Sequence, residues 1–136
     1  MAARDNPDAR TVIILCVDRH AKGYLQVVDM ALMLTNRRYI PCESSFEIQM
    51  ADALEAAGRS FIKPLRYDSA AETFPDFELV DTDPPRTVVE VWGMNHEAYN
   101  RRKAEKQAIY RAQKKPVIEW DARGPMPALA LRATNP

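Results

Sequence analysis

The chain has 136 residues, of which 46% are hydrophobic, and this is enough for one core of ordinary size. Its 19 Lys and Arg residues balance its 19 Asp and Glu residues, so the formal net charge is zero. A zero net charge excludes attraction of nucleic acid by the whole-molecule field, so such binding would need a local basic patch. Cys16 and Cys42 form no CxxC pair and fit reduced thiols. With no apolar signal or spanning stretch, we expect a cytoplasmic protein with no membrane partner.

The N-terminal part of the sequence predicts a tail followed by a β-hairpin. Residues 1–10 are charged and lack periodicity, as flexible tails do. Two apolar runs, 11–17 and 24–34, flank a polar segment and predict paired strands, although a helix over 24–34 fits the second run nearly as well. In the hairpin, strict alternation assigns one face to Gln26, Val28, Met30, Leu32 and Leu34, and the other to Leu25, Val27, Ala31 and Met33.

A helix and an edge strand are predicted next. Ser44-Ser45-Phe46-Glu47 has the form of a capping box, and apolar residues recur at helical spacing from Phe46 until Gly58. The run from Phe61 to Tyr67 predicts a strand, and Pro64 within it indicates an edge or a bulge.

The rest of the chain predicts a second hairpin, a second helix and a last strand. Runs 77–80 and 87–92 are joined by a turn-rich stretch, as in a β-hairpin. Asn95 is the expected cap of a helix from about 96 to 114, and 117–120 is the expected final buried strand. Residues 123–136 have the composition of a tail. We therefore predict an α+β fold in one domain, 11–122, with a mixed sheet of about four strands flanked by helices.

Two carboxylates on the second predicted hairpin are the first candidates for chemistry. Asp76 opens its first strand, and Glu90 lies among valines in its second. A carboxylate in so apolar a strand needs a partner, either a cation or a lysine. The alternative is that Asp76 only opens the strand and Glu90 faces solvent.

Two further residues could join these carboxylates. Lys106 lies on the helical stripe that includes Tyr99 and Tyr110, and an unpaired lysine on an inward stripe is costly unless it snorkels. Glu47 borders the buried face of its helix, although reaching back to the Ser44 amide would account for it fully.

Basic residues form a candidate nucleic-acid surface. The helix after Asn95 is strongly basic on its outer faces, and the strand before the hairpin could extend the patch. Charge runs are usually solvated faces, so the patch by itself is weak evidence. The candidates for DNA contact are Lys63, Arg66, Arg101, Arg102 and Lys103. A zinc site from Cys16, His20 and Cys42 lacks an accepted spacing.

These residues resemble the core of the PD-(D/E)XK nuclease superfamily. The shared features are a helix with a Glu, a strand, a Pro-Asp-Phe segment and a hydrophobic strand ending in a Glu. Glu90-Val91-Trp92-Gly93-Met94 followed by Lys106 and Tyr110 is similar to a branch associated with helicases and mobile elements, in which an E-x-x-G-M strand precedes a K-x-x-x-Y helix. The phrases YIPCESSFE and FIKPLRYD also resemble an uncharacterised family of plasmid and integrative-element proteins. The resemblance covers about residues 39–121.

The resemblance implies a restriction-endonuclease-like core and a metal-dependent DNA nuclease. Asp76, Glu90 and the main-chain carbonyl of Val91 would hold Mg²⁺ or Mn²⁺, with Glu47 completing the shell. The superfamily's strand lysine should stand at position 92, which here is Trp92. Either Lys106 has taken over that role, or the fold is an inactive module that binds nucleic acid or protein. The implied partners are DNA and a helicase or DNA-transfer machinery, and the N-terminal strands are compatible with a homodimer.

Overall fold

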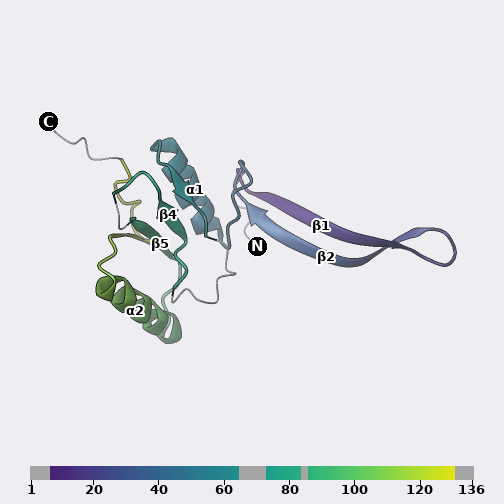
Figure 1. The fold of residues 1–136 in the computed structure, drawn as a ribbon. Helices are drawn as coiled ribbons and strands as arrows, with labels where there is room; N and C mark the ends of the chain where they lie inside the picture. The colour runs from purple at the N-terminus through teal and green to yellow at the C-terminus, as the bar shows by residue number, and fades with distance from the viewer. Residues whose placement is uncertain (1–6, 65–72, 84–85, 131–136) are drawn as a thin grey trace. The chain divides into compact units, whose positions relative to one another are not determined.

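The computed structural model describes residues 7–64, 73–83 and 86–130 (Figure 1). The chain divides into two compact units, Met1–Ile48 and Gln49–Pro136. The predicted α+β class is confirmed: an N-terminal β-hairpin, a mixed sheet of four strands and two helices are present. Within the described segments, every helix is too short or too polar to cross a bilayer.

The N-terminal unit contains a long antiparallel hairpin of β1, Arg10–Arg19, and β2, Leu25–Thr35. The predicted hairpin is confirmed, and the helical alternative for 24–34 is wrong. At the tip the chain turns at Gly23, whose φ of +90° lies in the region that glycine adopts without a steric cost. The His20 ring stacks on Tyr24 at a centroid distance of 4.5 Å and closes the turn.

A β-bulge in β2 changes which side chains share a face. Cys16 pairs with Asp29, whereas the next residue of β1, Val17, pairs with Val27. Val28 is therefore the extra residue, and the alternation of side chains reverses there. The predicted faces are corrected as follows: Leu25 and Val27 lie on the same face as Met30, Leu32 and Leu34.

The second unit is built around a sheet with the order β3-β4-β5-β6. Its strands are β3, Phe61–Ile62; β4, Phe77–Leu79; β5, Val88–Trp92; and β6, Val117–Asp121. The first three pair antiparallel, and β6 pairs parallel to β5. Every residue of β5 is buried, so β5 is the centre of the core.

Two of the predicted strands differ from the observed ones. The strand predicted over 61–67 ends at Ile62, because Pro64 lacks the amide that a ladder needs, and residues 65–67 lie outside the described part. The last strand was expected to be buried, but in β6 only Trp120 is. Its other side chains are half-buried or exposed.

The two helices lie on the two sides of β4 and β5 (Figure 1). Helix α1, Ser45–Ala56, starts at the predicted capping box, and its residues Ile48, Met50, Ala51 and Leu54 are fully buried. Helix α2, Glu97–Ala112, starts one residue later than predicted, and its cap is His96 rather than Asn95. His96 Nδ1 accepts a hydrogen bond from the Tyr99 amide, which is the bond that a helix N-cap provides.

A half-buried ion pair joins the segment after α1 to the segment after β4. The Arg59 guanidinium donates to both carboxylate oxygens of Asp81 at 2.7 and 2.8 Å, and to the carbonyl of Leu129 at 2.8 Å. Asp81 also accepts from the Ser60 amide. Its pKa is held at about 2, chiefly by the hydrogen bond from Arg59. Leu129 is buried, so at least this part of the predicted C-terminal tail is packed.

Replacing Asp81 should destabilise the second unit. In Asp81→Ala, Arg59 loses its anion while its side chain is only 4% exposed, so we expect the free energy of unfolding to fall by about 2 kcal/mol. Urea denaturation followed by tryptophan fluorescence measures this change. Asp83→Ala is the control, because Asp83 is exposed and only two residues away, and its curve should match the wild type. Equal losses in the two variants would contradict the role of the pair.

Candidate active site

Glu90 is the centre of the candidate site. It lies in the middle of β5, is 1% exposed, and is flanked in the chain by buried Val89 and Val91. Its neighbours along β5 are apolar because β5 lies between two other strands in the core. A carboxylate here must be paired or protonated, because an isolated buried charge is too costly.

Helix α2 supplies two donors to this carboxylate. Lys106 Nζ lies 2.7 Å from Glu90 Oε2, and Tyr110 donates its hydroxyl proton to Glu90 Oε1 at 2.5 Å. Lys106 and Tyr110 are four residues apart and therefore lie on one face of α2. The Lys106 side chain is 22% exposed, so the site is not sealed from solvent on the side of α2.

Asp76 lies beside Glu90 because β4 is shorter than β5. The β4–β5 pairing ends at Phe77 and Val89, and Asp76 directly precedes β4. Its Oδ2 accepts a hydrogen bond from the Val91 amide at 2.7 Å, so a side chain takes the place of the next backbone acceptor. The two predicted carboxylates are thereby brought to the same stretch of β5.

The surroundings raise the pKa of Glu90 to about 7 from its ordinary value of 4.5. Burial is the largest cause and the negative charge of Asp76 the second, while the charge and hydrogen bond of Lys106 act in the opposite direction. The pKa of Tyr110 is also raised, chiefly by burial, so this phenol remains a proton donor. Glu90 can thus gain or lose a proton near neutral pH.

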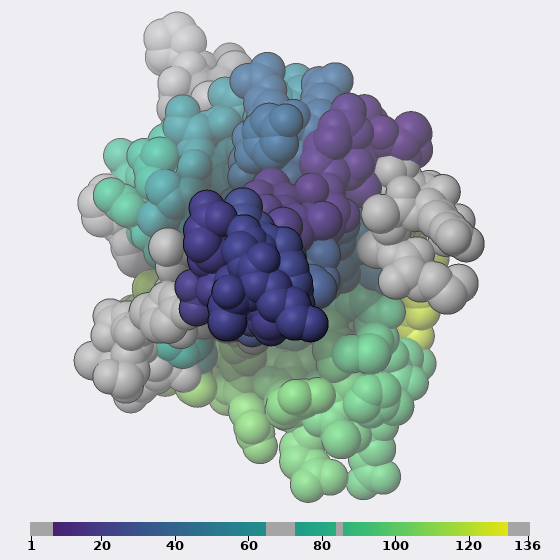
Figure 2. Space-filling model, turned by 90° about the vertical axis from the view of Figure 1, so that its right-hand side faces the viewer, coloured from purple at the N-terminus to yellow at the C-terminus, as the bar shows by residue number. Residues whose placement is uncertain are grey.

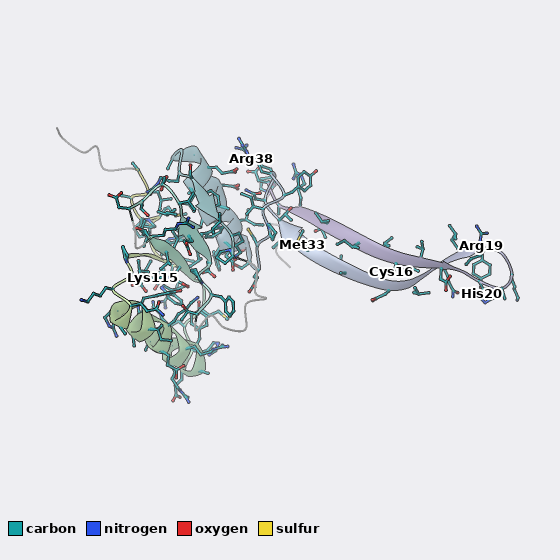
Figure 3. All side chains as sticks on the ribbon, in the orientation of Figure 1. Cys16, Arg19, His20, Met33, Arg38 and Lys115 are labelled. Carbon is teal, nitrogen blue, oxygen red and sulfur yellow. The ribbon has the colours of Figure 1, made fainter. Side chains whose placement is uncertain are left out.

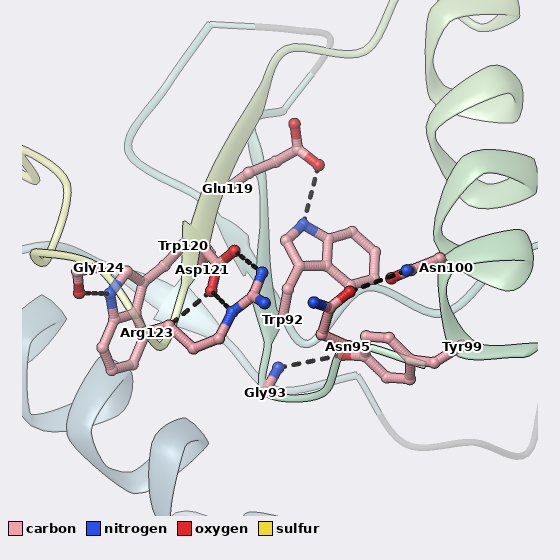
Figure 4. A network of polar contacts seen from close by, with 10 residues as sticks. All are labelled: Trp92, Gly93, Asn95, Tyr99, Asn100, Glu119, Trp120, Asp121, Arg123 and Gly124. Carbon is pink, nitrogen blue, oxygen red and sulfur yellow. Dashed lines mark hydrogen bonds and ion pairs between the residues drawn. The ribbon is translucent and has the colours of Figure 1, made fainter. Parts of the chain in front are cut away.

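Trp92, at the position where the resemblance expects lysine, belongs to a second polar network (Figure 4). Its indole N–H donates to Glu119 Oε1 at 2.9 Å, and Gln107 donates to the same oxygen at 2.6 Å. The Trp92 ring lies under two ammonium groups, with Lys103 Nζ 5.0 Å and Lys106 Nζ 5.9 Å from its centroid. The face of the Trp92 ring therefore attracts the ammonium groups of Lys103 and Lys106, although Trp92 itself carries no positive charge.

Some participants were missed at the level of sequence. The sequence places Tyr110 on the same helical stripe as Lys106, but its contact with the Glu90 carboxylate was not predicted. The four-residue spacing between Lys106 and Tyr110 was the signal that could have indicated this contact. Glu119 was not singled out; it is the β6 residue paired with Glu90 in register, which depends on the parallel pairing. Tyr99, predicted on the same stripe, accepts a hydrogen bond from the Gly93 amide at 3.1 Å and meets Trp92 edge to face.

Comparison with known families gives one match. The family model described as a protein of unknown function, DUF1173, matches residues 2–122, which is most of the chain. The chain belongs to DUF1173. No match was found among curated proteins or among solved structures.

In this DUF1173 chain the remaining predicted site residues fall into different places. Glu47 lies in the N-terminal unit, where its amide donates to Ser44 Oγ and its Oε2 accepts from the Glu43 amide, one residue before the expected Ser44. This is a helix cap, and a role for Glu47 beside Asp76 and Glu90 stays a prediction. Arg66 lies outside the described residues.

The predicted basic surface is less uniform than its sequence indicated. Arg101 and Arg102 are exposed on α2, and Arg101 is 3.9 Å from the carboxylate of Glu97. Lys103 is half-buried because it lies over Trp92, so it is not on the outer face of α2 as expected. Lys63 lies over the Phe77 ring at 4.8 Å from its centroid. Binding of nucleic acid by these residues stays a prediction.

The oxygen atoms at the site are of the kind that hard cations prefer. Asp76, Glu90 and the Val91 carbonyl would offer carboxylate and carbonyl ligands, which suit Mg²⁺ or Mn²⁺. Each carboxylate oxygen has two lone pairs, so the hydrogen bonds from Lys106 and Tyr110 leave room for a cation at Glu90. Among the described residues, no three His, Cys, Asp or Glu side chains form a ready-made metal cluster, including Cys16, His20 and Cys42. A cation would therefore need water or substrate oxygens as further ligands.

Proposed function

We propose that this chain is a metal-dependent DNA nuclease of the PD-(D/E)XK type. The contact of Lys106 Nζ with Glu90 Oε2 at 2.7 Å carries the proposal. This contact joins a lysine of α2 to the acidic residue of the central strand β5. Such a contact is needed if Lys106 has taken over the role that the superfamily gives to a lysine at position 92. The element order from α1 to β6 and the position of Asp76 beside Val91 add support.

The roles of the residues follow from their positions. Asp76, Glu90 and the Val91 carbonyl would hold Mg²⁺ or Mn²⁺, which when bound supplies a Lewis acid and a more acidic water. Lys106, whose side chain is partly exposed, would orient the attacking water or offset charge on the phosphate in the transition state. Tyr110 donates a hydrogen bond to Glu90 Oε1, the oxygen that Lys106 does not contact, and so orients the carboxylate.

DNA is the proposed substrate, and its backbone is the part that the basic residues would contact. Exposed Arg101 and Arg102 on α2, with Lys103, Lys63 and Arg66, would bind phosphates with little sequence preference. The resemblance to a helicase- and mobile-element-associated branch leads us to propose a helicase or DNA-transfer machinery as partner.

Replacing Asp76 tests the reaction. Purified protein is incubated with supercoiled plasmid or single-stranded DNA in Mg²⁺, Mn²⁺ or EDTA, and products are quantified on gels. We expect metal-dependent cleavage that Asp76→Asn lowers by about 100-fold, because an amide is a poor substitute for a carboxylate ligand. Asp83→Asn is the charge-matched control and should cleave like the wild type. No metal-dependent cleavage, or equal activity of Asp76→Asn and wild type, would disprove the nuclease.

A second candidate is a catalytically inactive nuclease-fold module that binds nucleic acid or protein. Trp92 at the usual lysine position favours it, because an indole held by Glu119 cannot act as a cation. Fluorescence anisotropy with labelled DNA at low and high salt tests whether the module binds nucleic acid or a protein. Salt-sensitive binding without cleavage would indicate a DNA-binding module, and absent binding would point to a protein partner.

A further inference from the structure

The β1–β2 hairpin carries an unusual amount of exposed aliphatic surface. Seven large aliphatic side chains share one face of it, and each is between 51% and 64% exposed. We call this the aliphatic face: Ile13, Leu15, Val17, Leu25, Val27, Met30 and Leu32. Side chains project from both faces along the hairpin (Figure 3), and those of its tip lie at the surface (Figure 2).

The bulge at Val28 is what makes the aliphatic face continuous. Without the register shift, Leu25 and Val27 would lie opposite to Met30 and Leu32. The same shift puts Asp29 on the other face, with Cys16. Asp18 pairs with Gln26 and also lies on that other face. From Ile13 to Val17 and from Val27 to Leu32, the aliphatic face therefore contains no charged side chain.

Such a hairpin is not expected to remain uncovered in water. Two strands alone are marginally stable, and independent stability needs further strands or a packed hydrophobic face. Contiguous apolar patches of this kind on soluble proteins mark interaction sites. A nucleic acid is a poor occupant, because Arg19, which pairs with Leu25, is the one cation on this face of the described hairpin, and from Ile13 to Val17 and from Val27 to Leu32 the face offers neither positive charge nor hydrogen-bond donors.

We propose that the aliphatic face is a homodimer interface, covered by the aliphatic face of a second copy of this chain. The charge-free stretches of two copies match in length and width, and stacking them about a two-fold axis buries no charge, because Arg19, which pairs with Leu25, lies at the end of the face. The aliphatic face extends over seven residue pairs, from Ile13–Leu32 to Arg19–Leu25, which at about 3.4 Å per residue and two strand widths of about 4.8 Å give a footprint of about 230 Å² per copy. Two copies together therefore bury at least about 460 Å² of flat area, and more once the relief of the side chains is counted, which is the size range of weak, reversible interfaces.

A charge placed on either face of β2 provides the test. Analytical ultracentrifugation of the full chain over a range of concentrations should show a dimer. Leu32→Lys puts an ammonium in the aliphatic face and should raise the dimer Kd by at least about 30-fold, as loss of an interface hot spot does. Ala31→Lys, one residue away on the other face, is the matched control and should leave the Kd within about three-fold.

Crosslinking gives a readout that does not depend on disrupting the hairpin. Leu15→Cys combined with Cys16→Ser moves the thiol from the other face to the aliphatic face. A short bismaleimide should link two copies of this variant faster than two copies of the wild type, whose reactive thiol is Cys16. Any of three results would overturn the proposal: a monomeric wild type, an equal effect of both lysine substitutions, or equal crosslinking rates. The aliphatic face would then be covered by another part of the chain or by another protein.

Discussion

Lys106→Met should abolish DNA cleavage, with an expected loss of about 1,000-fold under conditions where the wild type cleaves in Mg²⁺ or Mn²⁺. Methionine keeps the length and apolar stem of the side chain but removes the ammonium that lies 2.7 Å from Glu90 Oε2. DNA binding should change little, because one partly buried lysine contributes little to phosphate contact. Gel quantification of cleavage and anisotropy of labelled DNA measure the two effects separately.

Lys103→Met is the matched control for this substitution. Lys103 belongs to the same helix and also lies over the Trp92 ring, but no hydrogen bond joins it to Glu90. Its loss should lower cleavage by less than about ten-fold, through weaker phosphate contact alone. Equal losses in the two variants would mean that the positive charge of α2 matters in general and that Lys106 has no special role. A fully active Lys106→Met would remove the lysine from the mechanism.

Glu90 should make the folded protein less stable as the pH rises through neutrality. Its pKa is about 7 in the folded chain and near its ordinary value of 4.5 when unfolded. Between these values the folded state holds a proton that the unfolded state releases, so raising the pH favours unfolding. The contribution is fully present below about pH 4.5 and is lost by about pH 7, a change of about 3 kcal/mol.

Glu90→Gln isolates this contribution because glutamine has nearly the same shape and does not titrate. Urea denaturation in EDTA from pH 5 to pH 8 gives the free energy of unfolding of each protein. The wild type should lose about 2 to 3 kcal/mol more than Glu90→Gln over this range. Glu97→Gln, at a fully exposed position, should keep the wild-type slope. Parallel curves for wild type and Glu90→Gln would show that Glu90 has an ordinary pKa.

Much of the candidate site follows from local spacing. The stripe of Tyr99, Lys106 and Tyr110 is set by the helical repeat, and the hairpin 77–92 by two apolar runs around a turn. From these alone, Lys106 could either snorkel or point its ammonium at the carboxylates, and its Nζ lies 2.7 Å from Glu90 Oε2. Capping chemistry predicted Ser44 as the cap of α1 equally well, because the residues of a capping box are only three positions apart in sequence. Asn95 was a wrong cap because His96, the next residue, offers a ring nitrogen as acceptor.

The amino-acid sequence by itself determined the order of the elements from α1 onward and the face of α2 that carries Lys106, because these depend on residues a few positions apart. Only the tertiary structure decided which groups meet. The Tyr110 hydroxyl donates to Glu90, and the Trp92 indole donates to Glu119. Asp76 accepts a hydrogen bond from the Val91 amide of β5. The bulge that places Leu25 and Val27 on the aliphatic face depends on the register between two strands. Pairing register and strand length are set by packing across the sheet, which no local pattern in one strand records.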